Sequence, residues 1–287
     1  MSVRSSAIIA AYATILLGAG SALAQLADVD VVDTQAETAV PGRSNAIIGL
    51  GVGLTPDYEG SDHYEVGVVP FGRFSYKEYQ QYLQFGPNFG SRTYQARLNA
   101  MPYEGFELGP MLTYRPGRKH VENNDVNRLP NIDNAAEAGG FARYWLPFGL
   151  PGRQAVGVDL SGGADISNVY NGWWIQPGLD YKAGLSETVG FSARLFSDYA
   201  SANYMDEFFS ISSGQSARSG LRQFNADASW KDVGISLGVN WQFAAHWFTG
   251  AVANYARLLG DAADSPVARS AGSKDQAAGG VYVGYKF

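Results

Sequence analysis

The 287-residue chain contains no cysteine, so no disulfide can stabilise it. Basic residues are also few, 21 lysines and arginines against 27 aspartates and glutamates, and this acidic balance argues against nucleic acid as a partner. Beyond the first 24 residues, no segment approaches the roughly 18 consecutive apolar residues that a transmembrane helix needs. What the chain has instead is 35 glycines and 13% aromatic residues beside only 17% charged residues, a composition typical of an exported β protein.

The N-terminus predicts a secretory signal peptide over residues 1–24. Arg4 supplies the positive charge, Ala7 to Leu17 form a short apolar segment, and Ala22-Leu23-Ala24 is a small-residue cleavage site. Residues 25–45 are acidic and contain no aromatic side chain, so we expect a flexible periplasmic leader there. Residues 46–287 form the third part of the chain, a single folded domain.

Apolar residues alternate with small or polar ones along residues 46–287, which is the period of a β-strand. In "IIGLGVGLT", for example, Ile48, Leu50 and Val52 share one face and glycines occupy the other. The alternation changes phase near Lys231 and Asp232, which predicts a bulge. We expect twelve strands, at residues 46–55, 65–76, 80–90, 93–100, 104–115, 135–147, 154–165, 172–183, 188–199, 222–243, 247–258 and 276–287.

The connections between these strands differ in length in a regular way. Every even-numbered connection is short, whereas the long ones, 116–134, 200–221 and 259–275, are all odd-numbered. Outer-membrane barrels have this pattern of tight periplasmic turns and long outer loops, and a soluble β-sandwich, the alternative, has no reason for it. Because a sheet can span hydrocarbon only when no edge is left unpaired, the first strand must pair with the last. We therefore predict an all-β, transmembrane antiparallel β-barrel of about 12 strands in the cell outer membrane, in contact with its lipid.

Strand parity sorts the remaining charges into the barrel lumen, where positive and negative groups nearly balance. A balanced set can pair across the barrel, so we expect a narrow or plugged lumen, with a pore lined by the same residues as the alternative. The predicted lumen charges are Arg73, Arg97, Glu107, Arg115, Glu137, Arg143, Asp159, Asp180, Lys182, Arg194, Asp198, Asp227 and Lys286. On the last strand, Val281, Val283, Tyr285 and Phe287 share the opposite face and are expected to contact lipid.

The sequence carries no pattern that calls for catalysis. It has three histidines and no cysteine, and no histidine lies at a spacing that indicates a nucleophile with its base. The acidic segment around His63 could bind a divalent cation, but a solvated loop is the more common arrangement. We expect no catalytic residue, no cofactor site and no metal site, and a protein that is not an enzyme.

Five segments are distinctive beyond the strand pattern: "PDYEGSDHYE" (56–65), "GPMLTYRPGR" (109–118), "SGLRQFNADA" (219–228), "RLLGDAADSPV" (257–267) and the aromatic C-terminus. In these segments the chain resembles the MipA/OmpV family of Gram-negative outer-membrane proteins, and the likeness runs from about residue 47 to residue 287. The resemblance implies a scaffold that ties a lytic transglycosylase to a murein synthase. It also implies that the strand ending at Phe287 is the signal read by the barrel-assembly machinery.

Two other functions stay open for a chain of this kind. One is a narrow porin or channel for small solutes, and the other is a surface adhesin that uses the long outer loops. For the scaffold, the leader is the expected docking segment, together with the turns at 146–153 and 242–247.

Overall fold

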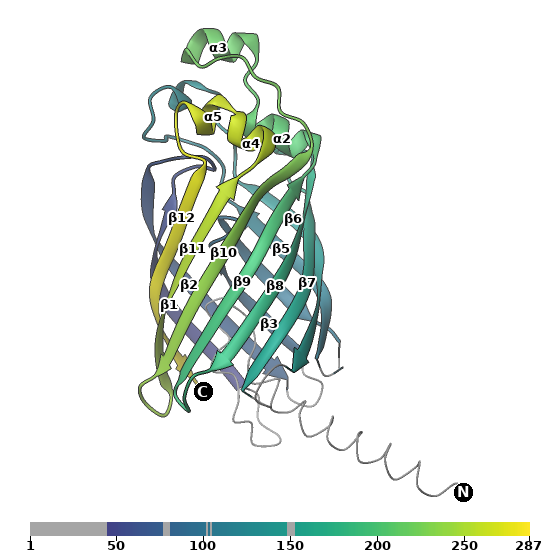
Figure 1. The fold of residues 1–287 in the computed structure, drawn as a ribbon, viewed down its shortest axis with the longest axis vertical. Helices are drawn as coiled ribbons and strands as arrows, with labels where there is room; N and C mark the ends of the chain where they lie inside the picture. The colour runs from purple at the N-terminus through teal and green to yellow at the C-terminus, as the bar shows by residue number, and fades with distance from the viewer. Residues whose placement is uncertain (1–44, 77–80, 102, 104, 148–152) are drawn as a thin grey trace, which may run out of the picture.

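Twelve antiparallel strands form one closed barrel in the computed structural model, which describes residues 45–76, 81–101, 103, 105–147 and 153–287 (Figure 1). Each strand pairs with its neighbours in sequence, and β1 also pairs with β12, from Ile47 opposite Lys286 to Leu54 opposite Gly279. The predicted fold and strand number are confirmed. The strands are β1 (Asn45–Pro56), β2 (Tyr64–Tyr76), β3 (Gln81–Asn88), β4 (Thr93–Asn99), β5 (Phe106–Arg115), β6 (Ala135–Pro147), β7 (Gln154–Asp165), β8 (Trp173–Gly184), β9 (Val189–Ala200), β10 (Ser229–Gln242), β11 (Trp247–Leu258) and β12 (Asp275–Lys286).

The predicted signal peptide and all but the last residue of the predicted leader lie outside the described residues. None of the helices in the described part of the chain has the length and apolar character that crossing a membrane requires.

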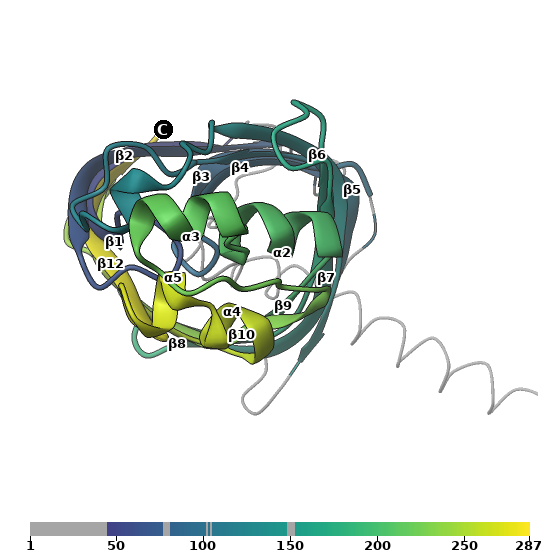
Figure 2. The same cartoon turned by 90° about the horizontal axis from the view of Figure 1, so that it is seen from above.

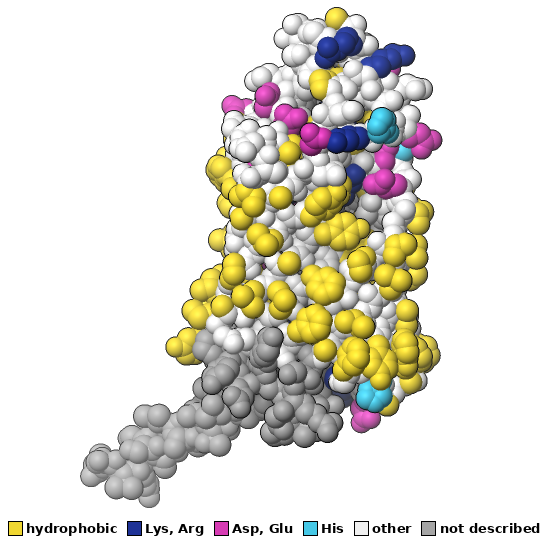
Figure 3. Space-filling model, turned by 180° about the vertical axis from the view of Figure 1, so that it is seen from behind, with side chains coloured by type: hydrophobic (Ala, Val, Ile, Leu, Met, Phe, Trp, Pro, Cys, Tyr) yellow, Lys and Arg dark blue, Asp and Glu magenta, His cyan; other side chains and the backbone are white. Residues whose placement is uncertain are grey.

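The outer surface of the barrel is apolar because alternate residues of every strand point away from the lumen. Leu50, Val66 and Val281 are each more than half exposed, and hydrophobic side chains form a broad band across the face of the barrel wall seen in Figure 3. Charged side chains gather beyond one end of this band. Exposed aromatic rings lie near both ends of the strands, with Trp173 and Trp230 at one end and Trp241, Trp247 and Phe287 at the other. This is the distribution of a lipid-facing barrel wall.

Glycines on the inner face make room for large rings from the neighbouring strands. A Cβ added at Gly49 would lie 2.1 Å from Cζ of Phe71, and one at Gly284 would lie 2.2 Å from Cζ of Phe248. The glycines that alternate along β1 and β12 thus allow aromatic side chains to fill the lumen.

The long connections fold into a cap over one end of the barrel rather than into open loops (Figure 2). Their helices are η2 (Val126–Arg128), α2 (Ala202–Phe209), α3 (Ser213–Ser219), α4 (Gly260–Asp264) and α5 (Pro266–Arg269). The short turns between β8 and β9 and between β10 and β11 lie at the opposite end, near the C-terminus (Figure 1). By the loop-length rule, the cap lies on the outer side of the membrane.

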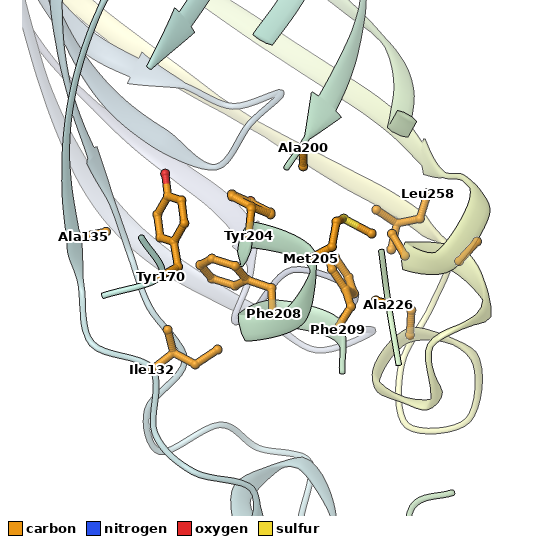
Figure 4. Close-up of a cluster of buried hydrophobic side chains, with 13 residues drawn as sticks. Ile132, Ala135, Tyr170, Ala200, Tyr204, Met205, Phe208, Phe209, Ala226 and Leu258 are labelled. Atoms are coloured by element: carbon orange, nitrogen blue, oxygen red, sulfur yellow. The ribbon is translucent and has the colours of Figure 1, made fainter. Parts of the chain in front are cut away.

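A hydrophobic cluster between α2, α4 and the barrel rim stabilises the cap (Figure 4). Tyr204, Met205, Phe208 and Phe209 of α2 are all buried, and their spacing places them on one face of the helix. The ring centroids of Tyr204 and Phe208 lie 4.6 Å apart, and that of Tyr170, from the β7–β8 connection, lies 5.1 Å from Tyr204. The cap therefore has a core of its own.

The tenth strand is shorter than predicted. It begins at Ser229 rather than at residue 222, because the preceding segment belongs to the cap, where Phe224 forms an isolated antiparallel bridge with Ile211. Asp227 was wrongly placed in the lumen: it is exposed, and its backbone N–H donates to Oδ2 of Asp261 at 2.8 Å. The predicted bulge near residues 231–232 is confirmed by a shift in the β9–β10 register between Trp230 and Asp232.

Candidate functional site: a charged lumen beneath a folded cap

The structure places most of the predicted lumen charges inside the barrel. Lys286 is half-buried at the periplasmic end and Asp227 lies in the cap, outside the lumen. The other eleven are buried: Arg73, Arg97, Glu107, Arg115, Glu137, Arg143, Asp159, Asp180, Lys182, Arg194 and Asp198. Any role of these groups in conduction stays a prediction.

Arg194, on β9, forms the centre of an ion-pair network in the middle of the lumen. Its Nη1 lies 3.0 Å from Oδ1 of Asp180, and its Nη2 lies 2.8 Å from Oδ1 of Asp159. Asp180 also forms an ion pair with Arg143, whose Nε is 3.3 Å from its Oδ2. These side chains come from β6, β7, β8 and β9, so the network connects four adjacent strands from the inside.

The same network continues toward the periplasmic end. Arg143 Nη1 lies 3.4 Å from Oε2 of Glu107, which also accepts from the hydroxyl of Tyr82 at 3.0 Å. Trp145 Nε1 donates to the other carboxylate oxygen of Glu107 at 3.2 Å. The ammonium of Lys182 lies 3.1 Å from the centroid of a Trp145 ring, within the range of a cation–π interaction.

A second group of charges lies directly beneath the cap. Arg115 Nε and Glu137 Oε1 form an ion pair at 2.6 Å. Glu137 also accepts from the hydroxyl of Tyr170 at 2.8 Å and from Nε1 of Trp174 at 2.7 Å. Because Tyr170 belongs to the β7–β8 connection and Arg115 and Trp174 belong to strands, this carboxylate links that connection to the barrel wall.

Sequence reasoning missed the ionic contact that joins the cap to the lumen. Glu59, in the β1–β2 connection, forms an ion pair with Lys231 and accepts from the hydroxyl of Tyr204 in α2 at 2.7 Å. Lys231 also lies 2.7 Å from Oδ2 of Asp232 and 3.9 Å from Oδ2 of Asp198. We call Glu59, Lys231 and Tyr204 the cap latch.

The bulge in β10 explains why the latch was not predicted. Neighbouring residues of a regular strand point to opposite faces, but Lys231 and Asp232 are both buried on the lumen side. The extra residue of a bulge permits this arrangement. The phase change at residues 231–232 was the signal in the sequence that could have identified both groups.

Electrostatics in the latch favour the charged form of Glu59. Burial by itself would raise the pKa of this carboxyl, but Lys231 and Arg115 outweigh burial and lower the pKa below its ordinary value of 4.5. A lowered pKa in the folded state means that ionised Glu59 stabilises the protein above that ordinary value, and that this stabilisation is lost as the pH falls toward the pKa of the folded state.

We expect the stability difference between the native chain and Glu59→Gln to depend on pH in the same way as the stabilisation by ionised Glu59. It should be largest near neutrality and shrink below about pH 4.5, because a protonated carboxyl resembles the amide that replaces it. Urea unfolding in phosphatidylcholine vesicles at a series of pH values measures this difference. A difference that stays constant from pH 7 to pH 3 would show that the charge of Glu59 does not stabilise the cap.

The lumen wall formed by β1, β2, β11 and β12 is mainly apolar, although β2 also contributes the buried Arg73. Ile47, Phe71, Phe248, Val252 and Tyr282 form one buried cluster there, with Phe71 and Tyr282 in an edge-to-face contact at 5.4 Å. The lumen therefore has a charged half, which is lined by the ion-pair network, and an aromatic half, which is lined by this cluster.

The described residues contain no group of three or more histidine, aspartate or glutamate side chains placed to hold a metal ion. The arrangement in the lumen consists of paired charges and packed rings, whose physical effect is to hold the strands together.

The predicted lipid-facing residues of the last strand have the expected exposure. Val281, Val283 and Phe287 are 62%, 42% and 63% exposed, and Tyr285 is half-buried. The N–H of Phe287 donates to the carbonyl of Ala46 at 2.9 Å, so the C-terminal residue takes part in closing the barrel. Recognition of this strand by the assembly machinery stays a prediction.

Comparison with known proteins relates the chain to named outer-membrane proteins. It is 32% identical to the MltA-interacting protein of Escherichia coli K12 over 84 residues, which cover 29% of this chain and 32% of that protein. It is 28% identical to the putative outer membrane protein YiaT of the same organism over 149 residues, 51% of this chain and 57% of that one. The chain thus spans about a third and about half of the length of these two curated relatives.

Among solved structures, OmpT of Vibrio cholerae aligns with 88% of this chain and 100% of its own, at 9% identity and a TM-score of 0.38. The model of the family described as MltA-interacting protein MipA matches residues 48–287, which include all of β2 to β12 and most of β1. This chain, an outer-membrane β-barrel, belongs to the MltA-interacting protein MipA family.

Proposed function

We propose that this protein is a non-catalytic scaffold that anchors a murein-degrading lytic transglycosylase, and with it a murein synthase, at the inner side of the outer membrane. The observation that carries the proposal is the match of the MltA-interacting protein family to residues 48–287. A relative that shares 84 aligned residues bears the name MltA-interacting protein.

The architecture supports an anchoring function more than a wide pore. The ion pairs of Arg194 and Arg115 join neighbouring strands on the lumen side, and the outer end is covered by the cap that Glu59 attaches to Lys231. A barrel built in this way presents its periplasmic end to partners inside the cell envelope while its wall remains in lipid.

The expected docking surface is on the periplasmic side. The leader, residues 25–45, and the turn at 148–152 lie outside the described residues apart from Asn45, and both stay candidates. Among the described turns, the one between β8 and β9 presents Leu185, which is 62% exposed. The turn between β10 and β11 presents His246, whose ring stacks on Tyr285 with centroids 5.5 Å apart.

Deleting residues 26–43 from the mature chain is expected to abolish capture of a lytic transglycosylase, because the deletion removes the longest periplasmic segment while leaving all twelve strands. An affinity pull-down from envelope extract measures the amount of captured transglycosylase, which is detected by its murein-cleaving activity. A matched control removes residues 213–219, which form α3 in the cap, and should leave capture unchanged. Full capture by the 26–43 deletion would rule out docking through the leader, and capture by neither the native chain nor the deletion would contradict the scaffold itself.

Two other functions make different predictions. A narrow channel for small solutes would give steady single-channel currents in a planar bilayer, which the paired charges of the lumen oppose. An adhesin would depend on the cap, of which α3 is the most distant part from the barrel (Figure 1). Loss of surface attachment on deletion of residues 213–219 would favour the adhesin.

A further inference from the structure

The barrel wall is incompletely paired between β2 and β3. Their ladder extends only from Tyr76 opposite Gln81 to Gly72 opposite Phe85. From Tyr64 to Phe71, β2 pairs with β1 on its other side, and the described pairings give this segment no partner on the β3 side. In the same way, Gly86 to Asn88 of β3 pair only with β4. We call this opening the lateral gap.

The sequence explains why the ladder stops there. If the β2–β3 register continued past Gly72, Pro70 would lie directly opposite Pro87. Proline has no N–H, so neither residue can donate a hydrogen bond across the gap. Prolines in sheets are confined to edge strands, strand ends and bulges. Two of them at the same level of adjacent strands therefore keep the gap open.

A cavity of about 220 Å³ lies in the lateral gap and passes through the wall. Its lining includes Val69 and Thr93, which are buried on the lumen side, and Val66 and Tyr94, which are exposed on the lipid side. Residues from both faces of a sheet can line one cavity only where the sheet is interrupted. Gly67 leaves the cavity clear, since a Cβ added there would meet no atom within 4 Å.

Phe89 lies where this cavity meets the interior of the barrel. It lines the cavity in the lateral gap and also a small cavity against Phe71, Val252 and Tyr282, the aromatic half of the lumen. It lines a third cavity that reaches Glu59 and Asp232 beneath the cap. An apolar side chain at this junction separates the gap from the rest of the lumen.

The size and lining of the cavity define what it would accept. A cavity of about 150 Å³ with an apolar lining binds benzene, so about 220 Å³ suits a molecule of one or two fused rings. Val66, Val69, Pro87 and Phe89 supply apolar surface, and the ion pair of Arg92 with Glu65, at 3.5 Å, lies at the outer rim. Exposed Tyr94 and Tyr114, with ring centroids 6.3 Å apart, have the position of interfacial aromatics in lipid-facing barrels.

We propose that the lateral gap is a side entrance through which a small apolar solute, dissolved in the outer leaflet, enters the barrel and reaches the aromatic half of the lumen past Phe89. This inference is independent of the scaffold function, because it concerns the wall of the barrel and not its periplasmic end.

The absence of cysteine provides a direct test, since a single thiol can be placed in the gap. In the full mature chain in phosphatidylcholine vesicles, Val69→Cys is expected to react with apolar N-phenylmaleimide about tenfold faster than Met111→Cys, a difference equivalent to about 1.4 kcal/mol. Met111 is an equally buried residue on the inner face of β5, away from the gap. A charged methanethiosulfonate should modify Val69→Cys slowly, because the route passes through lipid.

Filling the gap should close the entrance. Adding Gly67→Trp to Val69→Cys is expected to slow the reaction with N-phenylmaleimide about tenfold, and Gly67→Leu serves as a second variant if the larger ring disturbs assembly. Gly214→Trp, on an exposed glycine of α3 that also has open space around it, is the matched control and should leave the rate unchanged. Heat-dependent gel mobility verifies that each variant is folded. Equal rates for Val69→Cys with and without Gly67→Trp would overturn the proposal, as would faster modification by the charged reagent.

Protection identifies the occupant. Naphthalene dissolved in the vesicles should slow the modification of Val69→Cys and leave Val66→Cys, on the lipid-facing side, unaffected. No protection by naphthalene would show that lipid chains or water fill the gap and would contradict a site for small apolar solutes.

Discussion

Replacing Arg194 with alanine is expected to destabilise the barrel by about 3–5 kcal/mol, the cost of removing the cation that pairs with two buried carboxylates. Arg194 is paired with both Asp159 and Asp180, and all three side chains are buried. In a confined lumen the two carboxylates would then repel each other. Urea unfolding of the mature chain in phosphatidylcholine vesicles, monitored by tryptophan fluorescence, measures the loss.

Two further variants separate the charge effect from a loss of packing. Arg257→Ala removes an arginine whose ion pair with Asp275, at 2.6 Å, is exposed, and it should change stability little. Combining Arg194→Ala with Asp159→Asn and Asp180→Asn removes the two negative charges and should restore part of the lost stability. An equal loss in the single and the triple variant would show that Arg194 contributes by packing and not by pairing.

Replacing Lys231 with methionine should have a comparable effect on the cap. Glu59, Asp198 and Asp232 all approach its ammonium, so the variant leaves three carboxylates together without the cation between them. We expect a loss of about 3–5 kcal/mol and a cap that opens more often. Hydrogen exchange along α2 reports the opening, and planar-bilayer recording should show brief currents more often than for the native chain.

Lys274→Met is the matched control, because Lys274 also belongs to the outer end of the molecule but forms a partly exposed ion pair with Asp264 at 3.4 Å. It should leave exchange in α2 unchanged. If Lys231→Met unfolds at the native urea concentration and exchanges at the native rate, the cap does not depend on the latch.

The barrel could be predicted because its physical requirements act along each strand. A barrel wall that faces lipid on one side and the lumen on the other requires apolar residues to alternate with small or polar ones. Ile48, Leu50 and Val52 follow this pattern without interruption. The same alternation located Arg194, Asp159 and Asp180 in the lumen. Which of these charges pair depends on the offset between neighbouring strands, and strand parity does not contain that information.

The cap and the lateral gap could not be predicted because both depend on contacts between distant parts of the chain. The strand periodicity of the sequence assigns Tyr204 to a loop. It is the packing of α2 against Tyr170 that places Tyr204 near Glu59. The phase change at Lys231 indicated a bulge but not its partners. Pro70 and Pro87 are 17 residues apart in the sequence, and only an extension of the β2–β3 register beyond Gly72 would place them opposite each other. Asp227 was misplaced because the apolar residues around it, Phe224 and Ala226, pack in the cap and not in the wall.

The pairing of β1 with β12 also has a kinetic consequence. Ile47 and Lys286 are almost at the two ends of the folded unit, so the contact that completes the cylinder has the greatest sequence separation in it. Contacts of this kind form slowly, since the long intervening chain must be ordered first. Until then two strand edges expose free backbone groups that can pair with other chains and aggregate. We therefore expect that shortage of a carrier able to shield both edges during transit would produce aggregates before any other defect.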